Sequence, residues 1–130
     1  MPLMNDRPRI EPIPPRPPQR GALQMLPGDP RTIARRAKDP AYAPFWTMVQ
    51  HHAARARKAD LTVAAMHEET RSRAAKALAL THWATGSARD AARAKEALFQ
   101  AGAGHWTSWC GAGDAILDYL VAADLLRAAG

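Results

Sequence analysis

The stretch Thr85-Gly86-Ser87 constrains the fold of this chain more than any other feature, because it ends one helix and begins the next with no residue between them. A glycine after the last helical turn is the common left-handed C-terminal residue. Ser87 follows at once as an N-cap, and Asp90 three positions later completes a capping-box pattern. Alanines at helical spacing line both sides of the reversal. The sequence therefore predicts a tight antiparallel helical hairpin within an all-α fold.

Cap residues and helical spacing predict the other helices. The expected helices span about residues 30–38, 40–57, 62–85, 88–101 and 114–128. No segment shows the period-two alternation of a strand. The core residues are mostly alanines, which bury little area each, so we expect close helix packing and modest stability.

The first 27 residues are predicted to form a disordered arm outside one helical domain at residues 28–130. Prolines interrupt the arm, remove backbone donors and favour polyproline II. Residues 12–18 read PIPPRPP, which contains overlapping PxxP spacings and an arginine. This stretch is either a plain spacer or a docking segment for a proline-binding domain.

The net charge of +6 favours an anionic partner, provided that the charge is focused on one surface. The basic residues fall on several separate helices, which favours solvated outer faces and disfavours nucleic acid as a partner. No apolar run approaches the roughly 20 residues that span a bilayer, so no membrane is predicted. No signal peptide is visible, and the chain taken literally is cytoplasmic.

The sequence predicts no metal, no cofactor and no catalytic residue of its own. Cys110 is the single cysteine, which excludes an intrachain disulfide and a cysteine-based zinc site. His67 begins the stretch HEETR, where Arg71 occupies the place of the second histidine of the zinc-protease signature. The glycines between residues 102 and 113 lack the preceding strand that a phosphate-binding loop needs.

Two groups of residues remain as candidates for function or structural roles. Trp106 and Trp109 stand among glycines with His105 beside them, so the indoles either stack on sugar rings or cover the small core. Asp124 falls on the apolar face of the last helix, where a carboxylate is costly unless it is paired. We expect a buried partner for Asp124, such as an arginine, a tryptophan or a backbone amide.

Three stretches resemble the N-terminal part of the heparinase II/III-like and alginate-lyase-like polysaccharide lyases. The first is GDPR at 28–31 with ARRAKDPAYAPFW at 34–46. The second is the hairpin ALALTHWATGSARDAARAKEAL at 77–98. The third is Trp106 or Trp109 followed by Leu117 and by VAADLL at 121–126, in which Ala123 replaces the usual tyrosine.

The resemblance implies an incomplete (α/α) toroid and a uronate-containing, anionic polysaccharide as ligand. In that family the catalytic Tyr, His and Asn lie in later segments, so we expect a truncated lyase-like fragment without activity alone. Its members are typically periplasmic or secreted. His105, Trp106 and Trp109 would then form one wall of a glycan cleft, and exposed helix faces would invite self-association. The alternative is a small helical protein-interaction module with a Pro-rich docking arm.

Overall fold

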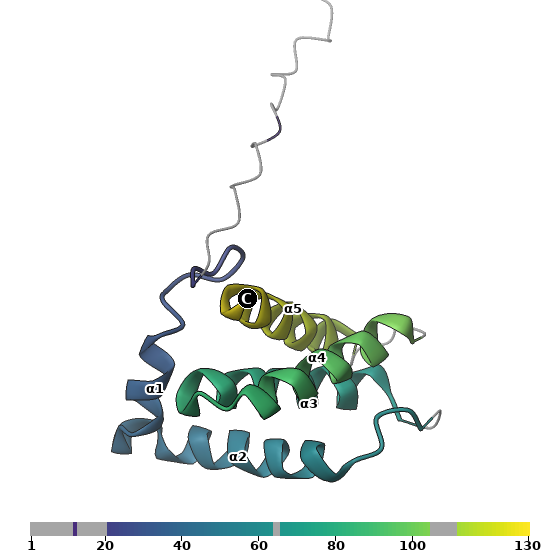
Figure 1. Ribbon diagram of the computed structural model, residues 1–130, viewed down its shortest axis with the longest axis horizontal. Coiled ribbons are helices and arrows are strands. Elements are labelled where there is room, and N and C mark those ends of the chain that lie inside the picture. Colours follow the sequence, from purple (N-terminus) through teal and green to yellow (C-terminus); the bar gives the residue numbers. More distant parts are fainter. Residues whose placement is uncertain (1–11, 13–20, 64–65, 105–111) are drawn as a thin grey trace, which may run out of the picture.

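The computed structural model describes residue 12 and residues 21–63, 66–104 and 112–130. Within these residues the chain is helical and has no strand, which confirms the all-α prediction. The elements are α1 (Thr32–Ala37), the 3-10 helix η1 (Pro40–Tyr42), α2 (Ala43–Lys58), α3 (Glu68–Thr85), α4 (Ala88–Ala103) and α5 (Ala112–Ala129). Helix α3 lies at the centre and packs against α2, α4 and α5; α2 lies below it and α5 above it in Figure 1.

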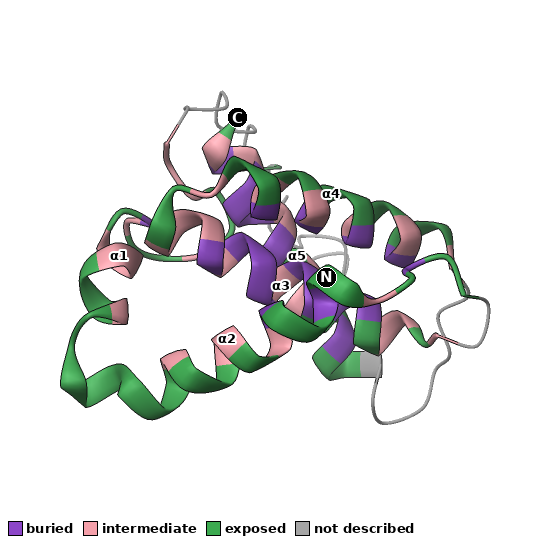
Figure 2. Cartoon of the chain, turned by 60° about the horizontal axis from the view of Figure 1, so that its bottom comes forward, coloured by how far each residue is buried: buried purple, intermediate pink, exposed green. Residues whose placement is uncertain are grey.

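The core is built mainly from alanines, together with a few leucines. Its members are Ala53, Ala56, Leu61, Ala74, Ala75, Ala77, Leu78, Ala79, Ala94, Ala97, Ala122, Leu125 and Leu126. Figure 2 shows the buried residues concentrated on the central helices, whereas α1 has none and α2 has only Ala53 and Ala56. Small side chains let the helices approach closely, so packing depends on backbone proximity rather than on large apolar groups.

The reversal between α3 and α4 lies at Gly86 and Ser87. Gly86 has φ 78°, the left-handed conformation that a side chain disfavours. The Ser87 hydroxyl accepts a hydrogen bond from the Asp90 amide, at 3.2 Å. The Asp90 carboxylate does not return to the Ser87 amide, which instead donates to the Thr85 hydroxyl. Only one half of the capping box therefore forms, and the Asp90 carboxylate binds another residue.

Replacing Gly86 with alanine should lower the free energy of unfolding by about 1 kcal/mol, because only the left-handed backbone is strained. A Cβ at Gly86 would meet no atom within 4 Å, so steric clash adds nothing. Gly113→Ala is the matched control, since Gly113 also has open space but no positive φ and lies within α5. Urea denaturation measures the free energy of unfolding of both variants and of the parent. An equal or smaller loss in Gly86→Ala than in Gly113→Ala would contradict the strain at this turn.

Helix α3 begins at Glu68, so the expected start near Thr62 was wrong. Two local interactions hold residues 60–63 in a different conformation. The Asp60 carboxylate accepts from the Thr62 amide at 3.0 Å. The Arg71 guanidinium donates to the carbonyl oxygens of Leu61 at 2.9 Å and Val63 at 2.8 Å. These bonds satisfy backbone groups that a longer helix would have used.

The packed part of the chain begins earlier than the expected boundary at residue 28. The Gly21 amide donates to the Ala128 carbonyl at 2.8 Å, and Arg127 donates to the Ala22 carbonyl at 2.6 Å. Residues 21–27 therefore lie against α5 and do not belong to a free arm. The physical reason is the buried carboxylate of Asp124, whose donors come from this segment. Residues 1–11 and 13–20 are outside the described part, so their predicted disorder stays a prediction.

Candidate functional site

The loop residues expected to face a sugar, His105, Trp106 and Trp109, lie outside the described residues. Their role as a glycan-binding wall stays a prediction. The other singled-out residues fall at two different places in the fold. Gly86, Ser87 and Asp90 lie at the turn between α3 and α4, and Asp124 lies in the C-terminal half of α5.

Asp124 binds the backbone of residues 24–26 and holds this segment against α5. Its carboxylate is fully buried and accepts from the amides of Gln24 at 2.9 Å, Met25 at 3.1 Å and Leu26 at 2.9 Å. Arg127 adds a hydrogen-bonded ion pair at 3.0 Å. Burial raises the pKa of Asp124, but the amide hydrogen bonds and Arg127 outweigh burial, and the net pKa lies below its ordinary value. The carboxylate oxygens are buried and already accept hydrogen bonds from three amides and Arg127, so we assign Asp124 a structural role.

Asp90 joins α4 to α2 through Arg57. The Arg57 guanidinium donates Nε and Nη2 to the two carboxylate oxygens, each at 2.8 Å, so the pair is bidentate. This hydrogen-bonded pair, more than any other cause, lowers the pKa of the buried Asp90 carboxyl. Each of the two groups is therefore occupied by the other, and we assign the pair a structural role.

A hollow of about 260 Å³ opens between α2 and α3, and we call it the α2–α3 pocket. Four polar side chains line it: His52 and Arg55 from α2, and Thr70 and Arg73 from α3. Its remaining lining residues are apolar: Ala56, Ala59, Leu61, Met66 and Ala74. The volume is below the roughly 300–1,000 Å³ of pockets for drug-sized ligands, so it suits one charged group or one ring.

The α2–α3 pocket is positively charged without acidic compensation. No Asp or Glu lines it, and neither Arg55 nor Arg73 has an ion pair among the residues that the structure describes. Burial lowers the pKa of His52, and the charges of Arg73, His51, Arg55 and Lys76 lower it further. Nearby Lys76 is paired with Asp118. At neutral pH the pocket therefore presents two guanidinium groups, a neutral imidazole and a hydroxyl, all of which can donate hydrogen bonds to an anion.

Sequence reasoning missed this pocket because it treated the basic residues of each helix separately. Arg55 and Arg73 are 18 positions apart in the sequence and belong to different helices. They line one hollow only because α2 packs along α3 through Ala53 and Ala56. The available signal was His52 and Arg55 at i, i+3 spacing, which places both side chains on one flank of α2.

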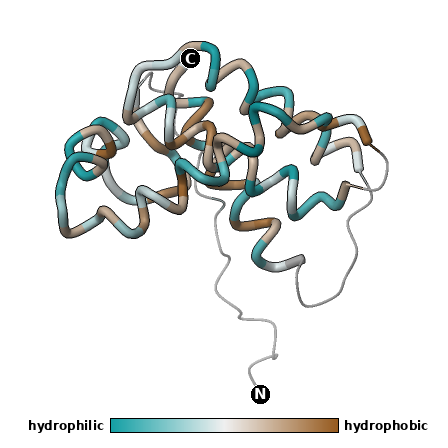
Figure 3. Tube along the Cα trace, turned by 90° about the horizontal axis from the view of Figure 1, so that it is seen from below, coloured by the Kyte–Doolittle hydropathy of each residue, from teal (hydrophilic) through white to brown (hydrophobic). Residues whose placement is uncertain are grey.

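The described residues contain no group of three His, Cys, Asp or Glu side chains arranged to hold a metal ion. Figure 3 shows hydrophobic and hydrophilic residues interleaved along the helices. Accordingly, none of the described helices has the length and apolar character to cross a membrane. No family model, curated protein or solved structure matches the chain.

Proposed function

We propose that the chain is a binding protein for an anionic glycan and that the α2–α3 pocket takes one carboxylate or sulfate group of the ligand. The observation that carries the proposal is that Arg55 and Arg73, on facing helices, line one hollow and have no acidic partner within the described ranges of the chain. Planar guanidinium groups bind such oxyanions with two parallel hydrogen bonds. The resemblance to polysaccharide lyases supports a uronate-containing ligand, with the chain acting as a lyase-like binding wall and not as an enzyme by itself.

The neighbouring residues suit this role. The apolar base of Ala56, Ala59 and Leu61 excludes water on one side, which strengthens a charge-assisted hydrogen bond. Thr70 and His52 offer additional neutral donors at the rim. The lowered pKa of His52 keeps it neutral near pH 7, so an incoming anion gains a hydrogen bond there but no third full charge.

The double variant Arg55→Ala with Arg73→Ala should bind a sulfated uronate oligosaccharide at least roughly tenfold more weakly than the parent. Each lost charge-assisted hydrogen bond is worth about 1.5–3 kcal/mol. Arg35→Ala with Lys38→Ala is the matched control, because it also removes two exposed positive charges, which lie outside the pocket and have no ion pair among the described residues. Isothermal titration at low salt measures the affinities. Equal affinity of the pocket variant and the Arg35→Ala, Lys38→Ala control would refute the site.

A second function, a small helical interaction module, is favoured by the apolar side chains that stay exposed on α4 and α5. Phe99 is 80% exposed and Leu117 is 61% exposed, with Ile116 and Leu120 near Leu117 on the helix surface. Such a surface favours association with a second copy of the chain. Sedimentation at increasing protein concentration distinguishes the two functions: association that does not respond to glycan, together with absent glycan binding, supports the interaction module.

A further inference from the structure

A second basic hollow adjoins the α2–α3 pocket at the C-terminal end of α2. This hollow, the α2–α4 pocket, has a volume of about 450 Å³ and lies between the end of α2 and the start of α4. Its charged lining residues are Arg57, Lys58, Arg89, Asp90, Arg93 and Glu96. Ala59 lines both pockets, so the two hollows meet at the end of α2.

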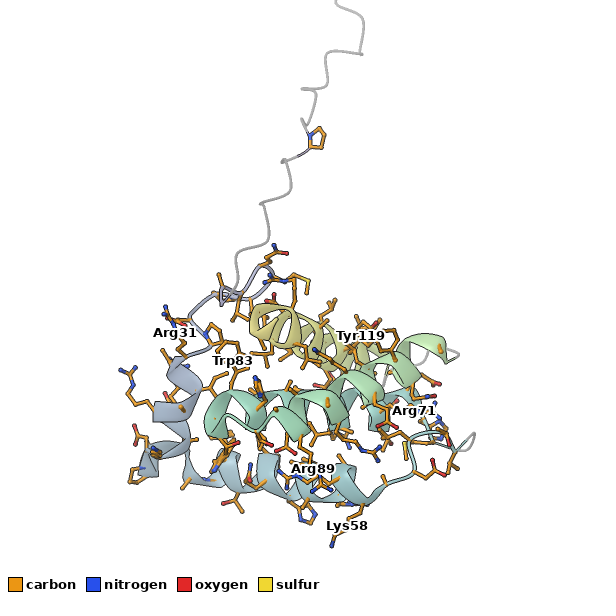
Figure 4. All side chains as sticks on the ribbon, in the orientation of Figure 1. Arg31, Lys58, Arg71, Trp83, Arg89 and Tyr119 are labelled. Atoms are coloured by element: carbon orange, nitrogen blue, oxygen red, sulfur yellow. The ribbon has the colours of Figure 1, made fainter. Side chains whose placement is uncertain are left out.

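Two of the four cations in the α2–α4 pocket are free to bind a ligand. Arg57 is paired with Asp90, and Arg93 is paired with Glu96 at 2.7 Å. Lys58 and Arg89 have no ion pair within the described part of the chain, and both are exposed. In Figure 4 the labels of Lys58 and Arg89 lie on the side of the molecule where α2 runs.

The free cations of the two pockets come from three helices, and the two pockets share Ala59. Arg55 and Lys58 are three positions apart on α2 and both exposed, so they are neighbours on its outer surface. Arg55 lines the first pocket with Arg73 of α3, and Lys58 lines the second with Arg89 of α4. We call Arg73, Arg55, Lys58 and Arg89 the cationic track.

We infer that the ligand of this track is a linear polyanionic glycan that occupies both pockets at once, and not a single charged sugar. The inference rests on the proposed function, because it extends the same binding surface. The α2–α3 pocket alone has room for one charged group, whereas the track presents charges in sequence, as a polymer with repeated carboxylates or sulfates requires. Among the residues that the structure describes, no tryptophan, tyrosine or phenylalanine lines either pocket. Single-stranded nucleic acid is bound by stacking bases on such rings, so the lining favours a glycan recognised by charge.

Binding a polyanion through several cations releases counterions, so affinity falls steeply as salt rises, and the slope grows with the number of contacts. A long ligand should therefore show a steeper salt dependence than a short one. Removing the second pocket's cations should reduce that slope for the long ligand only. A change of slope for the long ligand alone would distinguish a track that binds one polymer from surface charges that act independently.

The test uses the full chain and two oligosaccharides of the same sulfated uronate repeat. The short oligosaccharide reaches only the α2–α3 pocket, and the long one spans the cationic track. Lys58→Ala with Arg89→Ala should weaken the long ligand about tenfold, flatten its salt dependence and leave the short ligand unchanged. Arg55→Ala with Arg73→Ala should weaken both ligands. Arg35→Ala with Lys38→Ala again serves as the control for the loss of two surface charges.

Three results would overturn the inference. If the long ligand binds the Lys58→Ala, Arg89→Ala variant as tightly as the parent, while the Arg55→Ala, Arg73→Ala variant loses both ligands, the track is wrong and the proposed function stands. If neither of the two pocket variants differs from the Arg35→Ala, Lys38→Ala control, both proposals fail. If a single-stranded oligonucleotide of equal charge binds more tightly than the long glycan, the assignment of the ligand is wrong.

Discussion

Replacing Asp124 with asparagine should lower the free energy of unfolding by about 3 kcal/mol, the cost of breaking a buried ion pair. The parent carboxylate accepts from three backbone amides and from Arg127 in a fully buried position. An asparagine offers one acceptor oxygen where the aspartate offers two. Its NH2 group would face the donors that bind the other carboxylate oxygen in the parent. Some of these buried donors would lose their partners, and Arg127 would lose its counter-charge.

Urea denaturation measures the loss, and amide hydrogen exchange locates it. The amides of Gln24, Met25 and Leu26 should exchange much faster in the variant, because they lose their acceptor. Asp114→Asn is the control, since Asp114 is an exposed carboxylate on the same helix. If Asp124→Asn and Asp114→Asn unfold at the same urea concentration, Asp124 does not stabilise the packing of residues 24–26 on α5.

The stability contributed by Asp124 should also depend on pH. Its pKa is lowered in the folded chain, so the carboxylate binds a proton less readily there than in the unfolded chain. The contribution is therefore complete above the unfolded pKa, near 4, and is lost as the pH falls through the folded pKa. The stability difference between the parent and Asp124→Asn should shrink in acid. A constant difference from neutral to strongly acidic pH would count against the ionised carboxylate as the stabilising species.

Replacing Leu78 with alanine should lower the free energy of unfolding by about 3 kcal/mol, within the 2–5 kcal/mol typical of buried leucines. Leu78 is fully buried near the middle of α3. The core around it consists largely of alanines, which have no flexible side chain to move into the space that the leucine leaves. The cavity should therefore stay open, and the cost should exceed that of transferring the side chain to water.

Leu117→Ala is the control for Leu78→Ala, because Leu117 is 61% exposed on α5. The same change of residue type at that position should alter the stability by less than about 0.5 kcal/mol. Thermal and urea unfolding of both variants give the comparison. Similar losses at the two positions would mean that the core is loosely packed at α3.

Local signals predicted the parts of the fold that local interactions determine. Gly86 and Ser87 mark the reversal because the left-handed backbone and the N-cap depend only on neighbouring residues. The all-α class followed from helical spacing alone and is confirmed. The predicted start of α3 was wrong because Arg71, from within the helix, donates to carbonyl oxygens of the preceding loop. These hydrogen bonds favour a loop conformation over the helix that the local sequence favours.

The candidate site needed the packing of helices and could not be predicted from one segment at a time. Arg57 and Arg55 are two positions apart on α2, yet Arg57 reaches Asp90 of α4 whereas Arg55 lines the hollow with Arg73 of α3. Nothing in the sequence distinguishes the paired arginine from the free one. The difference arises because successive side chains on a helix point to different neighbours. A partial toroid and a glycan ligand remain predictions of the resemblance.

The carboxylate of Asp124 and the amide of Gln24 are separated by 100 positions, and this spacing has a consequence for how the chain folds during synthesis. The segment at 24–26 leaves the ribosome early, but its three amides lack their native acceptor, the Asp124 carboxylate, until α5 follows. Helices α2, α3 and α4 can pair while translation continues, whereas the N-terminal segment must wait. Closure of the fold is therefore a late event that joins the earliest and latest parts of the described chain.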